Sequence, residues 1–196
     1  MHISGTRKKL SNMLKILSIT LTFLLTCGTI VNAEPASTLI SAISQINANV
    51  VFMRHALAPG FGDPANFQLN DCKTQRNLDE KGKQQAKLIG RELLNSSIEF
   101  SEILSSEWCR CKETVSLLNI GKWKTFSGLN SFFQNYVGKE ETLTNLRRKL
   151  SNLNEGVTLM VTHQVVISAI TGSTSRSGEL IAFNTKTKAS INVILN

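Results

Sequence analysis

Apolar positions follow two different periods along the chain. Continuous apolar runs of strand length are typical of strands that are covered on both faces of a sheet. Such runs lie at 49–53 and 157–161, and further strands are predicted at 100–104, 180–183 and 191–195. Apolar residues spaced three and four apart predict helices instead. Helices are predicted at 36–47, 78–94, 109–119 and 139–153, and in a short segment after residue 163.

The order of these elements predicts the class of fold. Strands that alternate with helices are expected to form a three-layer α/β domain, with a mostly parallel central sheet flanked by helices. The last two strands are expected to form a hairpin with a turn near 186–188, and a short strand is predicted over 125–129. Asp79 is a suitable N-cap for its helix. Residues 58–77 are predicted to form a long loop, and loops of this length in compact domains are usually functional or disordered.

The first 33 residues are predicted to be an export signal. Four basic residues, Arg7, Lys8, Lys9 and Lys15, lie in or near its start, and the apolar run over 14–30 contains no acidic residue. Residues 31–33 are suited to signal cleavage. A retained membrane anchor is the weaker alternative, because polar residues interrupt the run. A lipoprotein signal that ends at Cys27 is left open. Residues 34–196 are then expected to form one periplasmic or secreted domain.

Charge narrows the class of partner. Residues 34–196 contain 18 Lys+Arg and 14 Asp+Glu, so the domain carries about +4, while the whole chain carries +8. The basic residues are scattered, which removes the compositional support for nucleic-acid binding. A modest positive balance fits a small anionic substrate. No membrane contact is expected after cleavage unless Cys27 is lipidated, and the oligomeric state is left open.

Three cysteines remain after the predicted signal. An oxidising compartment favours one disulfide and one free thiol. Cys109 and Cys111 are two residues apart and are badly placed to bridge each other. Cys72 is therefore expected to pair with one of them, and the choice between the two is left open. A zinc site has little support, because no clustered His or fourth Cys accompanies these three residues.

Polar residues with catalytic chemistry follow three of the predicted strands. They are Arg54-His55, Ser105-Ser106 leading to Arg110, and Thr162-His163. Ligands bind at the carboxyl ends of strands in such folds, so these segments are expected to converge. Imidazole can act as a nucleophile, and a nucleophile aimed at phosphorus needs cations for the phosphoryl oxygens. Arginine supplies a planar, permanently charged fork for this purpose.

At these residues the sequence resembles the histidine phosphatase superfamily, in its phosphoglycerate mutase-like branch 1. The family's Arg-His-Gly is similar to Arg54-His55-Ala56, and its Ser-x-x-x-Arg-x-x-x-Thr segment is similar to 106–114. "VTHQVVI" at 161–167 resembles the second histidine segment, with Gln164 in place of Gly. "LDEKGKQQAKLIG" at 78–90 resembles a family helix. The resemblance spans roughly residues 49 to 172.

The resemblance implies a phosphoric monoester hydrolase without metal or cofactor, and the predicted signal makes it an exported one. It implies that His55 is the nucleophile that becomes phosphohistidine and that His163 hydrogen-bonds the phosphoryl oxygens. Arg54 and Arg110 are then the clamp for the same oxygens, and Gln164 is placed to bind substrate at the rim. The layout is similar to that of small periplasmic members that act on lipopolysaccharide core sugars. By analogy, sugar phosphates or envelope glycans are the expected substrates.

One departure from the family pattern concerns the general acid. Many members carry a glutamate after the third strand, in a Leu-x-Glu pattern, where this chain has Asn130 and Ser131. Asp63 and Glu107 are candidate substitutes, and Glu179 is a weaker one. Without an acid the leaving group must depart unaided, as phosphoanhydrides, acyl phosphates and phosphoramidates do more easily than alkoxides. A non-catalytic member that binds phosphorylated ligands is the alternative hypothesis.

Several nearby residues are secondary candidates. Lys73 and Arg76, in the long loop, are candidates to meet a second anionic group, and exposed loop charges are the alternative interpretation. Phe132-Phe133 is a candidate to cover the pocket. Packing is the favoured role for Trp108 and Trp123.

Overall fold

The structure, a computed structural model, describes residues 35–195 and the side chains of residues 38–195. The predicted export signal, with Cys27, lies outside the described residues. The α-helices are α2 (Pro35–Ile46), α3 (Glu80–Asn95), α4 (Cys109–Leu118), α5 (Lys139–Ser151) and α6 (Gln164–Thr171). The strands are β1 (Val50–Arg54), β2 (Phe100–Ser105), β3 (Lys124–Thr125), β4 (Val157–Thr162), β5 (Leu180–Phe183) and β6 (Ser190–Val193). Short 3-10 helices are η1 (Cys72–Thr74), η2 (Ser127–Leu129) and η3 (Phe133–Asn135).

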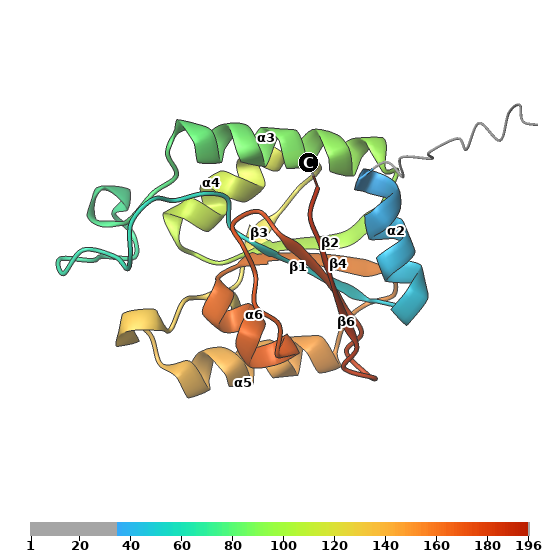
Figure 1. Ribbon diagram of the computed structural model, residues 1–196. Helices are drawn as coiled ribbons and strands as arrows, with labels where there is room; N and C mark the ends of the chain where they lie inside the picture. Colours follow the sequence, from blue (N-terminus) through green and yellow to red (C-terminus); the bar gives the residue numbers. More distant parts are fainter. Residues whose placement is uncertain (1–34, 196) are drawn as a thin grey trace, which may run out of the picture. The chain divides into compact units, whose positions relative to one another are not determined.

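The strands form one mixed sheet in the order β3-β2-β4-β1-β5-β6. β1, β2, β3 and β4 are parallel, and β5 and β6 form the antiparallel hairpin at one edge. Figure 1 shows α3 and α4 on one face of the sheet and α5 and α6 on the other. The predicted three-layer α/β fold with a mostly parallel sheet is therefore confirmed.

In the described part of the chain, no helix combines the length and apolar character needed to span a bilayer.

Two hydrophobic cores lie on the two faces of the sheet, and β1 contributes to both. Val51 and Met53 pack in the core with residues of α2, α3 and α4. Val50 and Phe52 pack in the other core with residues of α5 and α6. Successive side chains of a strand point to opposite faces, so a strand that is covered on both sides must be apolar throughout. The four residues are fully buried, which explains the continuous apolar run in the sequence.

The predicted elements agree with the observed ones to within about two residues, with one exception. Asp79 caps α3 as predicted, because its side chain accepts a hydrogen bond from the backbone N–H of Gly82 at 2.7 Å. The strand predicted over 125–129 is wrong beyond Thr125: the chain turns into η2. Gly128 packs against the ring of Phe126 and the backbone of α5, where an added Cβ has no room. After this turn the chain lies beside the carboxyl ends of β4 and β2, where Thr162 Oγ1 donates to the carbonyl of Leu129 and Ser106 Oγ donates to Asn130 Oδ1.

The long loop between β1 and α3 is fastened to the start of α4. Cys72 and Cys109 form a disulfide with a Cα–Cα distance of 5.7 Å, which decides the pairing that the sequence left open. Gln75 accepts a hydrogen bond at 2.9 Å from the backbone N–H of Cys109, one of the unpaired donors at a helix start. Cys111, two residues further along α4, is buried and free. The loop is thus an ordered wall of the domain.

The helix of the "LDEKGKQQAKLIG" segment supports the chain just after His55. A Cβ at Gly82 would collide with the carbonyl oxygen of Leu57, so glycine allows α3 to approach this backbone closely. Gln85 accepts a hydrogen bond from the backbone N–H of Leu57 at 2.9 Å and donates one to the carbonyl of Ser177 at 2.9 Å. The segment therefore positions the backbone on which the first histidine lies.

Candidate active site

The sheet order places the two histidines of the described chain beside each other. β4 lies between β1 and β2, so the residues that follow these three strands are neighbours. The backbone N–H of His55 continues the ladder to the carbonyl of Thr162 at 2.9 Å, and that of Ser106 bonds to Val161 at 2.9 Å. The His55 and His163 ring centroids are 5.4 Å apart. Parallel pairing thus brings together residues that are 108 positions apart in the sequence.

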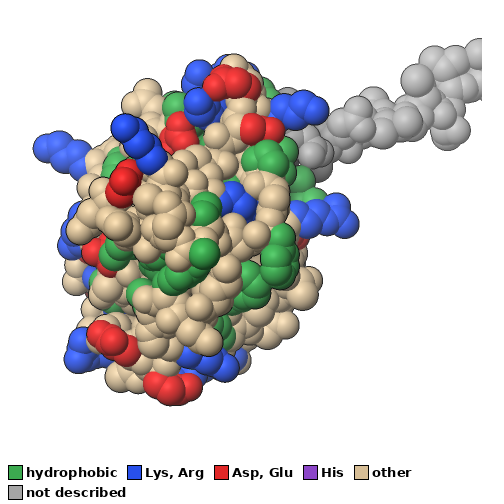
Figure 2. Space-filling model, turned by 90° about the vertical axis from the view of Figure 1, so that its left-hand side faces the viewer, with side chains coloured by type: hydrophobic (Ala, Val, Ile, Leu, Met, Phe, Trp, Pro, Cys, Tyr) green, Lys and Arg blue, Asp and Glu red, His purple; other side chains and the backbone are tan. Residues whose placement is uncertain are grey.

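These residues line a cavity of about 160 Å³, many times the roughly 10–15 Å³ that one water requires. We call Arg54, His55, Arg110 and His163 the phosphoryl wall, and Phe61, Ser131, Phe133 and Val165 the mouth wall. The remaining lining residues are Gly60, Gly62, Arg76 and Gln164. Figure 2 views the molecule from the side of the long loop and shows hydrophobic side chains around a recessed basic one. The structure thus brings the predicted Arg54, His55, Arg110, His163 and Gln164 to one cavity.

The His55 ring is held in one tautomer. Its Nδ1 is 2.7 Å from the carbonyl oxygen of Ala56, which can only accept, so Nδ1 carries the proton. Its Nε2 accepts a hydrogen bond from Arg110 Nε at 3.2 Å. Burial, and next the charge of Arg110, lower the pKa of His55 well below its ordinary value. His55 is therefore a neutral imidazole whose lone pair is at Nε2, on the side of the guanidinium groups.

His163 is oriented by a chain of hydrogen bonds. Arg110 Nη2 donates to His163 Nδ1 at 3.4 Å, so Nε2 carries the proton and donates to Ser106 Oγ at 3.0 Å. Ser106 Oγ in turn donates to Asn130 Oδ1 at 3.1 Å. Burial, followed by the charge of Arg110, lowers the pKa of His163 well below its usual range. A bound anion is expected to accept from this ring only after a change of tautomer or protonation.

Arg110 is fixed by the long loop. Its Nη1 forms an ion pair with Asp63 Oδ1 at 2.8 Å, and both side chains are about 95% buried. Asp63 also accepts from the backbone N–H of Arg76 at 3.0 Å and from Trp108 Nε1 at 3.0 Å. Burial raises the pKa of Asp63, but the charge and hydrogen bond of Arg110 outweigh it, so the net pKa is lowered. Asp63 therefore stays ionised.

The surroundings of Asp63 argue against a role as a general acid. A carboxyl that must donate a proton near pH 7 needs a raised pKa, and this one has a lowered pKa. Its carboxylate is also turned to Arg110 rather than to the cavity, which it does not line. Asp63 positions the Arg110 guanidinium instead.

Arg54 lies at the other side of the cavity and has a free donor. Its Nη1 donates to Gln164 Oε1 at 3.1 Å and to the carbonyl of Ser175 at 2.8 Å. Its Nε is buried without a hydrogen-bond partner among the described residues. A buried unpaired donor costs free energy unless a ligand satisfies it. Arg54 and Gln164 together are therefore suited to bind an anion at the rim.

The other acid candidates do not line the cavity either. Glu107 accepts a hydrogen bond from Asn130 Nδ2, and it does not line the cavity. Glu179 is buried elsewhere, where it accepts from the backbone N–H of Arg176 and from Asn192 Nδ2. Ser131, which stands where the resemblance would place a glutamate, does line the cavity. The structure therefore places no predicted carboxylate at the site.

The secondary candidates divide into two groups. Arg76 lines the cavity, where its guanidinium donates to the carbonyls of Gly62 and Ala58 and braces the loop. Lys73 is exposed and does not line the cavity, which favours the alternative interpretation as an exposed loop charge. Trp108 is fully buried, as expected for packing, and Phe133 lines the mouth.

Sequence reasoning missed Phe61, which is 90% exposed at the mouth. It lies between Gly60 and Gly62, which have φ of +93° and +69°, and its ring contacts Phe133 with centroids 5.1 Å apart. The Gly-Phe-Gly pattern in a long loop was the available signal, because two flexible residues around an aromatic one mark a tight exposed turn.

No group of three or more His, Cys, Asp or Glu side chains in the described part of the chain is arranged to hold a metal ion. Cys111 Sγ lies 3.5 Å from His163 Nε2, but burial raises the pKa of this thiol to about 12. The thiol is thus protonated at neutral pH and is neither a ready ligand nor a nucleophile.

The same fold occurs in solved structures of low sequence identity. An Escherichia coli K-12 protein assigned provisionally as an alpha-ribazole-5'-P phosphatase is 16% identical, with a TM-score of 0.52 over 75% of this chain and 95% of that one. A Thermus thermophilus protein is 13% identical, with a TM-score of 0.53 over 74% and 99%. A Mycobacterium tuberculosis protein is 13% identical, with a TM-score of 0.52 over 76% and 97%.

No family model and no curated protein matches the chain. At these identities the structural likeness establishes a shared three-layer α/β fold, and activity has to be argued from the site itself.

Proposed function

We propose that the chain is a member of the histidine phosphatase superfamily that hydrolyses phosphorylated small substrates through a phosphohistidine on His55. The observation that carries this proposal is a neutral imidazole with its Nε2 lone pair next to the guanidinium of Arg110, 3.2 Å away, in a cavity with two further arginines. A nucleophile must be unprotonated, and phosphoryl transfer needs positive charge around the equatorial oxygens. The fold shared with the E. coli protein, assigned provisionally as a phosphatase, is a supporting analogy.

In the first step a phosphoryl oxygen takes over the hydrogen bond that Arg110 Nε makes to His55 Nε2, which frees the lone pair. Nε2 then forms a bond to phosphorus, and the bond from phosphorus to the leaving atom breaks with its electron pair on the leaving group. Arg54 Nε and Arg110 donate to the phosphoryl oxygens as charge develops. The Nδ1–H bond to the Ala56 carbonyl stabilises the positive charge that forms on the ring.

In the second step water attacks the phosphorus of the phosphohistidine. An oxygen–phosphorus bond forms, and the electron pair of the nitrogen–phosphorus bond returns to Nε2. Both protons of the water leave with the released phosphate, which then exchanges protons with solvent. The same arginines bind the oxygens in both steps, so the site is restored unchanged.

The test is turnover of p-nitrophenyl phosphate by the purified chain, with and without EDTA. The wild type is expected to be active in both conditions, and His55→Ala is expected to lose roughly 10⁴-fold or more in kcat, as for removal of a catalytic nucleophile. His163→Ala is the matched variant: it is expected to be slow but still to form a labelled phosphohistidine at residue 55. Full activity of His55→Ala, or a rate that depends on metal, overturns the proposal.

A non-catalytic ligand-binding protein is the second candidate. The observation that favours it is that none of the twelve described residues lining the cavity is a carboxylate. This candidate predicts that vanadate or phosphate binds the wild type and that no donor is turned over. Binding that is lost in Arg110→Ala while all turnover is absent would establish it.

The finer features of the function are also proposals. The pattern over residues 1–33 supports export to the periplasm or beyond, and a disulfide in the domain suits an oxidising compartment. Incorporation of labelled palmitate at Cys27 tests for a lipoprotein. Sugar phosphates or envelope glycans are the substrates that the sequence resemblance favours, and assays of their release of phosphate test this.

A further inference from the structure

This inference rests on the proposed function and narrows the substrate class. We propose that the site accepts phosphoryl donors whose leaving group departs as a stable anion, without a proton from the protein. Aryl phosphates represent this class. Alkyl phosphates are expected to be poor substrates, and these include most of the sugar phosphates that the sequence resemblance favours, so the two expectations compete. The leaving group lies against the mouth wall, between Phe61, Phe133 and Val165.

The first support is the absence of a usable acid. Twelve of the residues that the structure describes line the cavity, and none of these twelve is a carboxylate. Asp63 is the acidic residue tied to the phosphoryl wall, and its ion pair with Arg110 at 2.8 Å holds it as an anion. Glu107 is bound to Asn130 outside the lining. Within the described chain, an alkoxide leaving group is therefore left without a carboxyl to protonate it.

The other polar groups of the site do not replace an acid. The Nε2–H of His163 is engaged with Ser106 Oγ at 3.0 Å, on the side away from Arg110. Ser131 Oγ accepts from the backbone N–H of Phe133 at 3.3 Å, and a serine hydroxyl is far too weak an acid to protonate a leaving group at neutral pH. The arginines stay charged. A leaving group that is stable as an anion departs without a proton from any of these groups.

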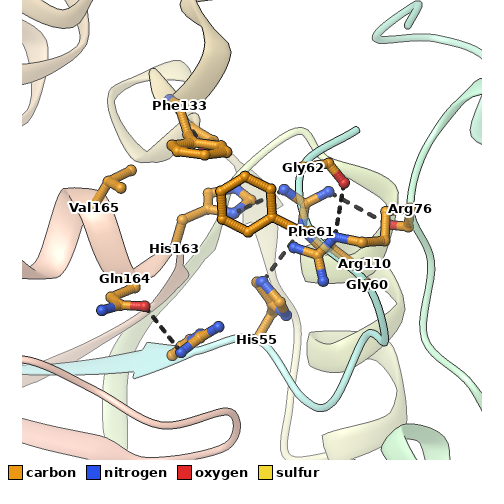
Figure 3. Close-up of a pocket in the computed structure, with 12 residues that line it drawn as sticks. His55, Gly60, Phe61, Gly62, Arg76, Arg110, Phe133, His163, Gln164 and Val165 are labelled. Atoms are coloured by element: carbon orange, nitrogen blue, oxygen red, sulfur yellow. Dashed lines mark hydrogen bonds between the residues drawn. The ribbon is translucent and has the colours of Figure 1, made fainter. Parts of the chain in front are cut away.

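The second support is the shape of the side where the leaving group must lie. Phosphoryl transfer places the attacking and leaving atoms roughly in line, so the leaving group faces away from His55 Nε2. Figure 3 shows Phe133 and Val165 across the cavity from His55, with Phe61 beside Phe133. The two rings meet edge to face at 85°, which leaves apolar surface for a flat group. This side suits an aromatic leaving group better than a hydroxylated one.

Hydrogen bonds between two segments also fix the position of the mouth wall. Gln134 Oε1 accepts from the backbone N–H of Asp63 at 2.6 Å, and its Nε2 donates to the carbonyl of the same residue at 3.2 Å. Gln134 has a φ of +67°, a conformation that non-glycine residues rarely adopt. Two loops that are 71 residues apart are thus joined behind Phe61 and Phe133.

In the balanced first step the P–O bond of an aryl phosphate breaks and its electron pair leaves with the aryl oxygen as phenolate. His55 Nε2 donates the pair that forms the N–P bond. The phenolate takes a proton from water after release, so the protein supplies none.

The experiment measures kcat/KM for a series of aryl phosphates of graded phenol acidity and for an alkyl phosphate. kcat/KM reports the phosphorylation step even when the second step limits turnover. We expect a steep fall as the phenol becomes less acidic. The alkyl phosphate is expected to be slower than p-nitrophenyl phosphate by at least about 10²-fold, the lower end of what general acid catalysis contributes where an acid is present.

Ser131→Glu and Ser131→Gln form a matched pair of variants. The glutamate supplies a carboxyl at the mouth, so it is expected to raise the ratio of alkyl to aryl turnover, while the glutamine of equal size is not. If neither variant folds, the series on the wild type still decides the question.

The outcomes separate this inference from the proposed function. A shallow series, with the alkyl phosphate turned over as fast as the aryl ones and both lost in His55→Ala, overturns the inference and leaves the proposed function standing. A series without any His55-dependent turnover overturns both. A steep series that becomes shallow in Ser131→Glu supports the inference.

Discussion

The two walls of the cavity are built in different ways. The phosphoryl wall comes from strand ends and the start of a helix, and its residues His55, Arg110 and His163 are 2–3% exposed. The mouth wall comes from two loop positions, the start of the short helix η3 and the first turn of α6. Its rings Phe61 and Phe133 are 90% and 38% exposed. The phosphoryl wall is charged or titratable, whereas the mouth wall is apolar apart from one serine. Fixed cations suit the phosphoryl group, which every proposed substrate shares. An apolar rim suits the leaving group, which differs from one substrate to another.

The walls also differ in what fixes their geometry. β-sheet register and a buried ion pair hold the phosphoryl wall. Side-chain bonds between two loops hold the mouth wall. Substitutions in the phosphoryl wall are therefore expected to lower kcat/KM for all substrates alike. Substitutions in the mouth wall are expected to change kcat/KM by an amount that depends on the leaving group.

Among the changes that distinguish the two walls, the largest effect is expected from Asp63→Asn. The substitution removes the charge that holds Arg110, and a displacement of about 1 Å in such a clamp costs roughly 10²-fold in rate. The loss in kcat/KM is expected to be equal across the aryl phosphate series, since Asp63 acts on the phosphoryl side. The measured rates are divided by the folded fraction of each variant, which circular dichroism gives.

Asp71→Asn is the control for Asp63→Asn, because Asp71 lies in the same loop and caps η1 through the N–H of Lys73. If the loss in kcat/KM of Asp63→Asn instead grows steadily as the leaving group becomes poorer, Asp63 acts as an acid. The phosphoryl wall would then also respond to the leaving group, against the comparison between the two walls.

The next effect concerns the disulfide that ties the long loop to α4. Cys72→Ser is expected to lower the free energy of unfolding by roughly 2–4 kcal/mol, because the bridge closes a sequence separation of 37 residues. Urea unfolding with and without reductant measures this. Wild type should lose stability on reduction, while the double variant Cys72→Ser, Cys109→Ser should not respond. An unchanged midpoint in reduced wild type contradicts the prediction.

A smaller effect is expected from pH. His55, the proposed nucleophile, has to be a neutral ring to attack phosphorus. Burial and the charge of Arg110 lower its pKa, so protonation sets in only below the usual value near 6.5. kcat/KM, corrected for substrate ionisation, is expected to hold as the pH falls through 6.5. It then drops about tenfold per pH unit once the pH is below the lowered pKa. If kcat/KM instead falls on the acid side with a midpoint at pH 6.5 or above, the ring of His55 is exposed to water.

The smallest effect is expected from Phe133→Ala. The loss of one face of the mouth wall is expected to raise KM for aryl phosphates roughly two- to tenfold, as for an aromatic contact of about 0.5–1.5 kcal/mol. Inhibition by inorganic phosphate, which lacks a leaving group, is expected to stay unchanged. Leu94→Ala, at an exposed apolar residue of α3, is the control. Equal weakening of phosphate and aryl phosphate would place Phe133 with the phosphoryl wall.

The layered fold and the two histidines could be predicted from short stretches of sequence. The apolar runs of β1 and β4 had to be buried on both faces, and that requirement can be recognised within five or six residues. Arg54, His55 and His163 follow those strands directly, so a local pattern placed them at the sheet edge where ligands bind. Asp79 was recognisable for the same reason, because a helix cap is a local feature.

Which distant side chains meet depends on how the elements pack. Cys72 pairs with Cys109 rather than Cys111 because the first residue of α4 faces the loop and Cys111 faces the sheet, a difference that no spacing along the chain records. Asp63 became a partner of Arg110 instead of an acid because the loop folds it into burial beside a cation. Protonation and pairing depend on neighbours in space, and those neighbours lie tens of residues away in sequence.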